Sequence, residues 1–245
     1  MLFSQVRAVD CGVLDQPAVT SGGPSAVVQK SGRQILLAAA TAAVNTPEES
    51  GTYWYVKTVS TSSMAGRELG ESSVETWTRR DGKSWFRASG KNEVTENGGK
   101  NGHWSDGFDL ENTRLSYEQI QRLATDPDEL VTWLVRHAGK PLHVETARVV
   151  PLLKVLSSMP APPEVRAAAF RALAAQPNVR NLGAVDGGES LAIDYPFGEL
   201  RLVTDVEAAR LRTSVFTSAA AKPGKDGTTL VEKAEWTDDL PKAIR

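Results

Sequence analysis

The sequence predicts an α+β fold: a curved antiparallel sheet with a helical insert packed over one face. Strand-like segments lie on both sides of a helical region at about 116–176. No helix separates consecutive strands, as the crossovers of a parallel sheet would require. A twisted sheet of about seven or more strands cannot stay flat and therefore curls.

Composition is that of an ordinary globular chain. The 245 residues are 40% hydrophobic and 24% charged, enough for a core that needs no disulfide or metal. A net charge of -2 and a pI near 6.0 exclude a broad basic surface for nucleic acid or an anionic membrane. The single cysteine, Cys11, has no partner thiol within the chain, and we expect no cofactor.

Residues 1–32 are interpreted as a flexible leader and linker, because 16–32 are rich in Gly, Pro and Ser. Residues 33–240 form the predicted domain. Its first helix covers 33–44, with an apolar stripe formed by Ile35, Leu36, Ala39 and Ala43.

Strands are predicted next, from Thr52 onward and again over 75–89. Asp81 and Gly82 mark a tight hairpin turn within the second segment. The Gly- and Asn-rich residues 89–113 are expected to form a long exposed loop or ragged hairpin.

The helical insert is predicted from capping signals. Ser116 with Gln119 forms a capping box before a helix that begins at Tyr117. Asp126 caps a second helix that runs to Gly139. Two more helices are predicted, one over 144–157 with a kink at Pro151 and one between the prolines at 162–163 and Pro177.

An antiparallel meander follows. Four segments with partial alternation and short links predict its strands: ESLAIDYP, GELRLVTD, ARLRTSVFTSA and TTLVEKAEW.

Several of these segments, over about 34–233, resemble an uncharacterised actinobacterial family of membrane-anchored extracytoplasmic proteins. The strings that carry the resemblance are RQILLAAATAA, GTYWYVKT, ETWTRRDGKSWFR, LSYEQIQRLATDPDELVTWL and MPAPPEVRAAAFRALAAQPNVRNLGAVDG. The most specific part is the Pro-Pro-Glu-Val-Arg helix followed by a strand near Val179. The resemblance implies a location outside the cytoplasm, often with a gene beside that of an extracytoplasmic-function sigma factor.

The segment order is also similar to the open half-barrel of lipoprotein carriers and of periplasmic regulators of anti-sigma factors.

Members of the actinobacterial family carry a transmembrane helix before this domain, whereas here Arg7, Asp10 and Asp15 interrupt any apolar signal core. No stretch approaches the length of a membrane span. These residues leave two locations open: that of a membrane-anchored extracytoplasmic protein and that of a cytoplasmic paralogue.

Motifs for catalysis or metal binding are absent. The three histidines, His103, His137 and His143, lack the spacing of a paired metal site. Asp106, Asp109, Glu111 and Asn112 cluster without the order of a calcium loop, and no phosphate-loop or nucleophile-elbow motif occurs. The sequence therefore predicts no metal site and no enzyme.

Aromatic residues on the predicted strands are the best candidates for a binding site. If the helices span the concave side of the sheet, a groove is left whose lining comes from the inward strand positions. We expect Trp54, Trp77, Trp85 and Leu134 near it, and the same side chains are alternatively interpreted as solid core.

The predicted function is a non-enzymatic binding or sensing module for an apolar small molecule or an envelope protein partner. A hydrolase whose site is assembled without a local motif is the alternative, and a purely structural surface protein is a third class. A deep aromatic-lined pocket favours binding, whereas a cleft joining a histidine to a carboxylate and a nucleophile favours hydrolysis.

Overall fold

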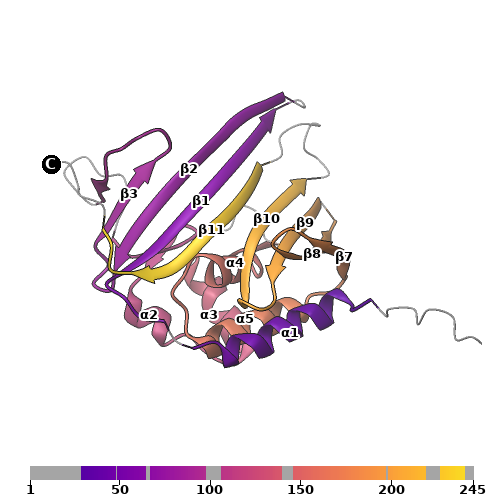
Figure 1. Cartoon of the computed structure of the whole chain (residues 1–245). Helices are drawn as coiled ribbons and strands as arrows, with labels where there is room; N and C mark the ends of the chain where they lie inside the picture. Colours follow the sequence, from indigo (N-terminus) through magenta and orange to yellow (C-terminus); the bar gives the residue numbers. More distant parts are fainter. Residues whose placement is uncertain are drawn as a thin grey trace, which may run out of the picture.

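A single antiparallel sheet of nine strands dominates the fold (Figure 1). The computed structural model describes residues 29–47, 49–64, 67–97, 106–139, 146–196, 198–218 and 227–240. Cys11, His103, His143 and most of the predicted leader lie outside these residues. The strand order is β4-β3-β2-β1-β11-β10-β9-β8-β7, with a separate two-stranded hairpin, β5-β6. The sheet does not close into a barrel, and the predicted fold class is confirmed.

The elements follow the predicted order. The strands of the large sheet are β1 (Tyr53–Met64), β2 (Arg67–Arg79), β3 (Ser84–Ala88), β4 (Thr95–Glu96), β7 (Val179–Val185), β8 (Gly188–Tyr195), β9 (Gly198–Asp205), β10 (Arg210–Ser218) and β11 (Gly227–Thr237). The hairpin is β5 (Phe108–Leu110) and β6 (Thr113–Leu115). The helices are α1 (Gly32–Asn45), α2 (Tyr117–Gln121), α3 (Pro127–His137), α4 (Val150–Ser157) and α5 (Pro163–Ala174).

Capping residues set the helix starts. Ser116 accepts a hydrogen bond from the Gln119 backbone N–H, and the Gln119 side chain accepts from the Ser116 backbone, as predicted. Asp126 caps α3. The predicted kink at Pro151 is wrong: α4 begins at Val150, so the proline occupies the first turn, where its missing N–H costs no helical hydrogen bond.

The turn between β2 and β3 fixes which residues share a face. The Arg79 N–H donates to the Lys83 carbonyl, which leaves a three-residue connection instead of a two-residue turn. Gly82, at φ 92°, takes the left-handed position that this connection requires. Trp77 consequently pairs with Trp85.

The second half of the sheet is the predicted meander, β8 to β11, with β7 beside β8, and β11 then pairs along β1. β10 and β11 are hydrogen-bonded only between 213–216 and 227–230. Beyond that ladder the two strands diverge (Figure 1). The sheet therefore has a split next to the first residues of β10.

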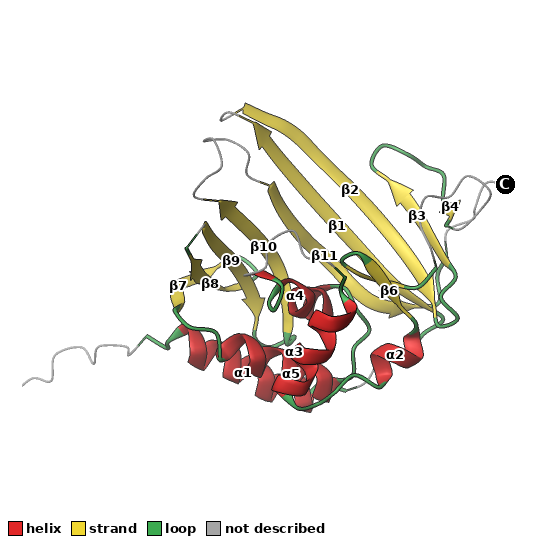
Figure 2. Ribbon diagram, turned by 180° about the vertical axis from the view of Figure 1, so that it is seen from behind, coloured by secondary structure: helices red, strands yellow, loops and turns green. Residues whose placement is uncertain are grey.

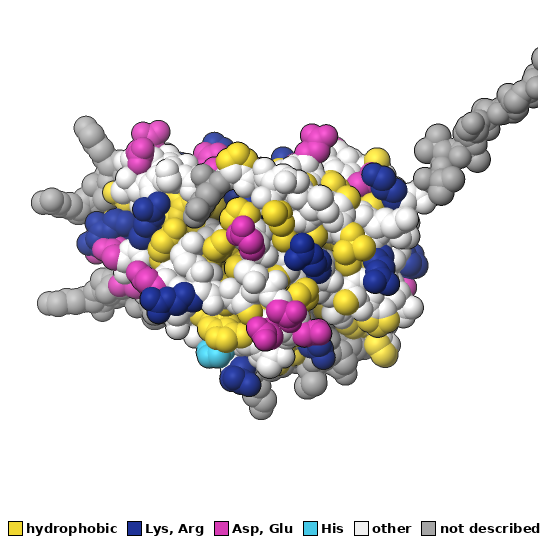
Figure 3. Space-filling model, turned by 90° about the horizontal axis from the view of Figure 1, so that it is seen from below, with side chains coloured by type: hydrophobic (Ala, Val, Ile, Leu, Met, Phe, Trp, Pro, Cys, Tyr) yellow, Lys and Arg dark blue, Asp and Glu magenta, His cyan; other side chains and the backbone are white. Residues whose placement is uncertain are grey.

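Helices cover the concave side of the sheet. α1 packs along α5, α4 contacts β10 and the β5-β6 hairpin, and α3 packs on α4 and α5 (Figure 2). The apolar stripe of α1 is buried as predicted. From below, the helical layer shows hydrophobic side chains scattered among charged ones (Figure 3). Within the described part of the chain, no helix has the length and apolar character to cross a membrane.

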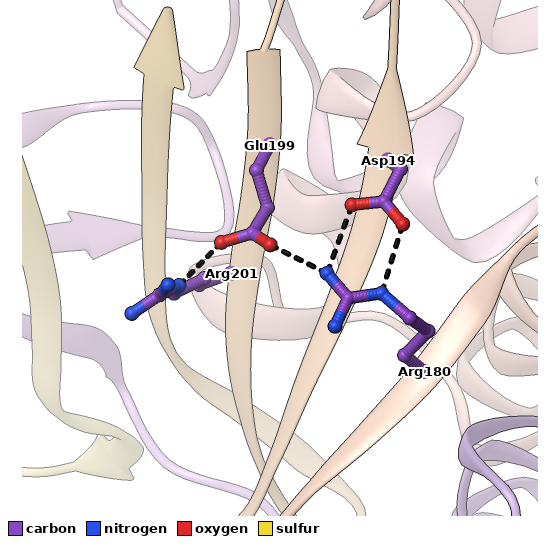
Figure 4. Close-up of polar contacts among 4 residues, drawn as sticks. All are labelled: Arg180, Asp194, Glu199 and Arg201. Carbon is purple, nitrogen blue, oxygen red and sulfur yellow. Dashed lines mark hydrogen bonds and ion pairs between the residues drawn. The ribbon is translucent and has the colours of Figure 1, made fainter.

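Charged residues form a cross-strand network on β7, β8 and β9 (Figure 4). Arg180 donates two hydrogen bonds to Asp194, at 2.8 and 2.9 Å, and one to Glu199, at 2.6 Å. Arg201 also donates to Glu199. Every charge in this exposed network has a partner, which marks it as support for the sheet.

Candidate functional site

A groove of about 370 Å³ lies between the concave face of β1, β2 and β3 and the layer formed by α4 and the β5-β6 hairpin. Its floor comes from alternate residues of the three strands. These are Trp54, Val56 and Thr58 of β1, Val74, Thr76 and Thr78 of β2, and Ser84, Phe86 and Ala88 of β3. Strand alternation places them all on one face, so the floor is apolar with hydroxyl groups interspersed.

The opposite wall carries the charged groups of the groove, including Arg114 of β6. Phe108 and Asp109 of the hairpin and Lys154 of α4 line it. Lys154 Nζ and Asp109 Oδ2 form an ion pair at 2.7 Å, with both side chains partly exposed. An apolar floor with a few charged groups at one side is the usual composition of a small-molecule pocket.

One hydrogen bond ties the floor to this wall. The Trp54 indole N–H donates to the backbone carbonyl of Ser158, just after α4, over 2.8 Å. Trp54 is itself only 2% exposed. Its ring is therefore held in one orientation between sheet and helix.

The groove continues onto open sheet. β1 and β2 extend well beyond the helices (Figure 2). Val74, which lines the groove, is 41% exposed. Apolar surface is thus accessible from the outer end of the groove.

The four predicted site residues are not brought together. Trp54 lines the groove, whereas Leu134 is 1% exposed within the main core and does not line it. Trp77 and Trp85, also predicted near it, do not line the groove. Their strand neighbours Thr76, Thr78, Ser84 and Phe86 face the groove, so the two tryptophans point to the opposite face.

Trp77 and Trp85 instead form a small second core with Val94, to which Tyr53 and Tyr55 contribute. The Tyr55 hydroxyl donates to Glu75 at 2.7 Å, and Arg87 donates to the same carboxylate at 2.6 Å. The Arg87 hydrogen bond lowers the pKa of Glu75. Burial, and then the bond to Glu75, raise the pKa of Tyr55. For these aromatics the solid-core interpretation applies.

The acidic segment beside the groove does not form a metal site. The ion pair with Lys154 occupies the Asp109 carboxylate. Burial raises the pKa of the neighbouring Glu111, which Lys154 partly offsets. Across the described ranges, no group of three or more His, Cys, Asp or Glu side chains has the arrangement to hold a metal ion.

His137 is engaged within its own helix. Its Nδ1 lies 2.7 Å from the Trp133 carbonyl and its ring stacks on Trp133, with centroids 3.9 Å apart. Among the described residues, neither a histidine nor a cysteine lines the groove. The cleft expected for a hydrolase is not seen there.

Two arginines that sequence reasoning missed, Arg166 and Arg210, line a smaller cavity on which Trp54 also borders. A signal for Arg166 was present in the sequence. The segment VRAAAFRALA is apolar almost all round, so a helix formed from it must be buried and a charge within it is exceptional. Arg210 carried no such signal, because its burial depends on the split between β10 and β11.

No model of a known protein family matches the chain, and no curated protein matches it. Among solved structures, the chain is similar to a crystal structure of a LolA superfamily protein from Nitrosomonas europaea, at 11% sequence identity. The match covers 87% of this chain and 96% of the other, with a TM-score of 0.26.

Proposed function

We propose that the protein binds an apolar ligand with a hydrocarbon chain in the groove over β1, β2 and β3. The observation that supports this most directly is the groove's floor, on which Trp54, Val56 and Phe86 face a cavity of about 370 Å³. That volume falls within the range of about 300–1,000 Å³ found for small-molecule sites.

The open end of the groove supports a long, narrow ligand. Val74 of β2 is 41% exposed and leaves apolar surface of the groove uncovered. A chain that enters at this end covers that surface, which removes apolar area from water.

The proposal includes a location at the cell envelope, which the resemblance to the actinobacterial family implies, and a role without catalysis. The competing hydrolase needs a nucleophile, a base and an orienting carboxylate that converge on one point. The described lining of the groove supplies an ion pair, Arg114, Asn97 and hydroxyl groups without a histidine.

A chain-length series tests the proposal. Neutral alkyl alcohols are titrated into the protein and binding is followed by tryptophan fluorescence and calorimetry. Each added methylene group is expected to strengthen binding by about 0.8 kcal/mol, roughly fourfold, until the groove is full. Affinity that does not change with chain length contradicts a hydrocarbon site.

Two variants of one strand give a matched comparison. Thr58→Trp places a large ring in the groove, whereas Thr61→Trp places the same ring on the opposite, exposed face of β1. The first variant is expected to lose alcohol binding and the second to keep it. Equal binding by both variants excludes the groove as the site.

A further inference from the structure

A second cavity, of about 130 Å³, lies beside Trp54 where β10 and β11 have separated. Tyr117 of α2, Arg166 of α5, Arg210 of β10 and Trp236 of β11 line it. The volume is several times what one water molecule requires. It is large enough for a tetrahedral oxyanion.

Arg166 is a buried cation that forms no ion pair with any residue that the structure describes. Its side chain is 5% exposed, and its Nε has no hydrogen-bond partner. Among the described residues, no carboxylate forms an ion pair with it. Burial lowers the pKa of Arg166, and the carboxylate of Glu49 partly offsets this. Leaving a guanidinium buried and unpaired costs stability, which is unusual unless another group pairs with it.

Arg210 adds a second positive charge to the same cavity. Its guanidinium lies over the Trp54 ring, with Cζ 5.1 Å from the ring centroid. Burial, and then the neighbouring charge of Arg166, lower the pKa of Arg210 to about 10. Both arginines therefore carry their charge at neutral pH. In the described structure, neither is within ion-pair distance of an acidic side chain.

The N-terminal end of α5 borders the same cavity. Pro162 and Pro163 line the cavity, and no side chain caps this twelve-residue helix. Neither proline has an N–H, so α5 contributes only the positive end of its dipole here, and Glu164 in its first turn offsets part of it. Glu49 is the one carboxylate in the described lining, and it is exposed. The positive charges of Arg166 and Arg210 outweigh this single carboxylate in the lining.

We propose that Arg166 and Arg210 bind a phosphate group in this cavity. Guanidinium groups match the oxygens of phosphate in geometry and charge. The aromatic rings of Trp54, Tyr117 and Trp236 give the cavity walls of low dielectric, which strengthens the interaction. A bound phosphate would accept the hydrogen bond that Arg166 Nε lacks and would offset the repulsion between the two arginines.

Trp54 lines both cavities, so the two sites are neighbours in the fold. A ligand with a hydrocarbon chain in the groove and a phosphate at the arginines would occupy both. This link rests on the proposed function, whereas the phosphate site itself does not. Free phosphate and a phospholipid headgroup offer the same chemistry, and they are distinguished by experiment.

The test measures inorganic phosphate and short-chain phosphatidic acid separately, at one ionic strength, by calorimetry and by the shift in melting temperature. Both ligands should raise the melting temperature of the full chain by mass action. Arg166→Met and Arg210→Gln should each weaken binding by about tenfold or more, the loss of one charge-assisted hydrogen bond. Arg180→Gln, which removes an arginine already paired with carboxylates, is the control and should bind normally.

Stability separates a binding role from a structural one. Without ligand, Arg166→Met should melt no lower than the unchanged protein, because it removes an unpaired buried charge and keeps the volume. Glu49→Gln should tighten phosphate binding, and this variant changes only an exposed side chain. The proposal is therefore testable even if Arg166→Met does not fold.

Each outcome of these measurements either supports the phosphate site or overturns it. Arginine-dependent binding of phosphate supports the site. Arginine-dependent binding of phosphatidic acid alone also supports it and identifies a lipid as the source. Binding that both arginine variants retain at the strength of the unchanged protein, or no binding of either ligand, overturns it. Thr58→Trp should block alcohols and leave inorganic phosphate unaffected, so failure of the groove and failure of this site are distinguishable.

Discussion

The indole nitrogen of Trp54 lies 2.8 Å from the carbonyl oxygen of Ser158, and this bond joins the first strand of the sheet to the end of α4. The carbonyl belongs to the residue that ends the helix, where backbone oxygens lack helical partners. The indole therefore satisfies a helix end and also forms part of the groove floor.

Trp54→Phe is expected to lower the free energy of unfolding by about 1–3 kcal/mol, because the Ser158 carbonyl loses its donor in a partly buried place. Urea denaturation measures this change. Trp77→Phe is the comparison on the opposite face, where the helix end is unaffected. An equal loss in both variants shows that ring volume, and not the hydrogen bond, sets the cost.

Gly188→Ala is expected to destabilise the meander strongly. Gly188 has φ 144°, and a Cβ there would lie 2.2 Å from the Thr204 carbonyl oxygen on β9. Gly183→Ala isolates the effect of backbone strain, because Gly183 has φ 102° with no atom near its Cβ position. Strain alone costs about 1–3 kcal/mol. Thermal unfolding should give a clearly larger loss for Gly188→Ala, and equal losses contradict the close approach of β8 and β9.

Glu75 is expected to make the free energy of unfolding depend on pH in the acidic range. The hydrogen bond from Arg87 holds the pKa of Glu75 below its ordinary value of 4.5 in the folded state. The stabilisation that ionised Glu75 contributes is therefore complete above pH 4.5, and it is lost as the pH falls through the pKa of Glu75 in the folded state. Glu75→Gln should be less stable than the unchanged protein at neutral pH, with the difference shrinking on acidification.

Denaturant unfolding of both proteins from pH 7 down to pH 3 tests this expectation. Glu71→Gln, an exposed position on the same strand, is the control and should show no such convergence. A Glu75→Gln difference that stays constant with pH means that the Arg87 hydrogen bond does not stabilise the fold.

Helix starts could be predicted from the sequence because capping is local. Ser116, Gln119 and Asp126 form hydrogen bonds with N–H groups two or three residues away. Residues that are close in the sequence therefore determine where each helix begins. The meander was predictable for a similar reason, since short links force consecutive strands to pair.

The faces of β2 and β3 could not be predicted in this way. Asp81 and Gly82 are consistent with connections of two or three residues, and the two choices differ by one position in register. That one position decides whether Trp85 or Phe86 faces the groove. Arg166 and Arg210 meet only through tertiary packing of α5 against the split in the sheet.

The pairing of β1 with β11 has a consequence for how the chain folds. Trp54 lies opposite Trp236, so the centre of the sheet joins the first strand of the chain to the last. The β1–β3 unit and the β7–β10 meander both have local contacts and can form early. Until the final strand inserts between them, β1 and β10 remain unpaired edges exposed to other chains. Closing so long a loop is slow, and the chain is most prone to aggregation during that interval.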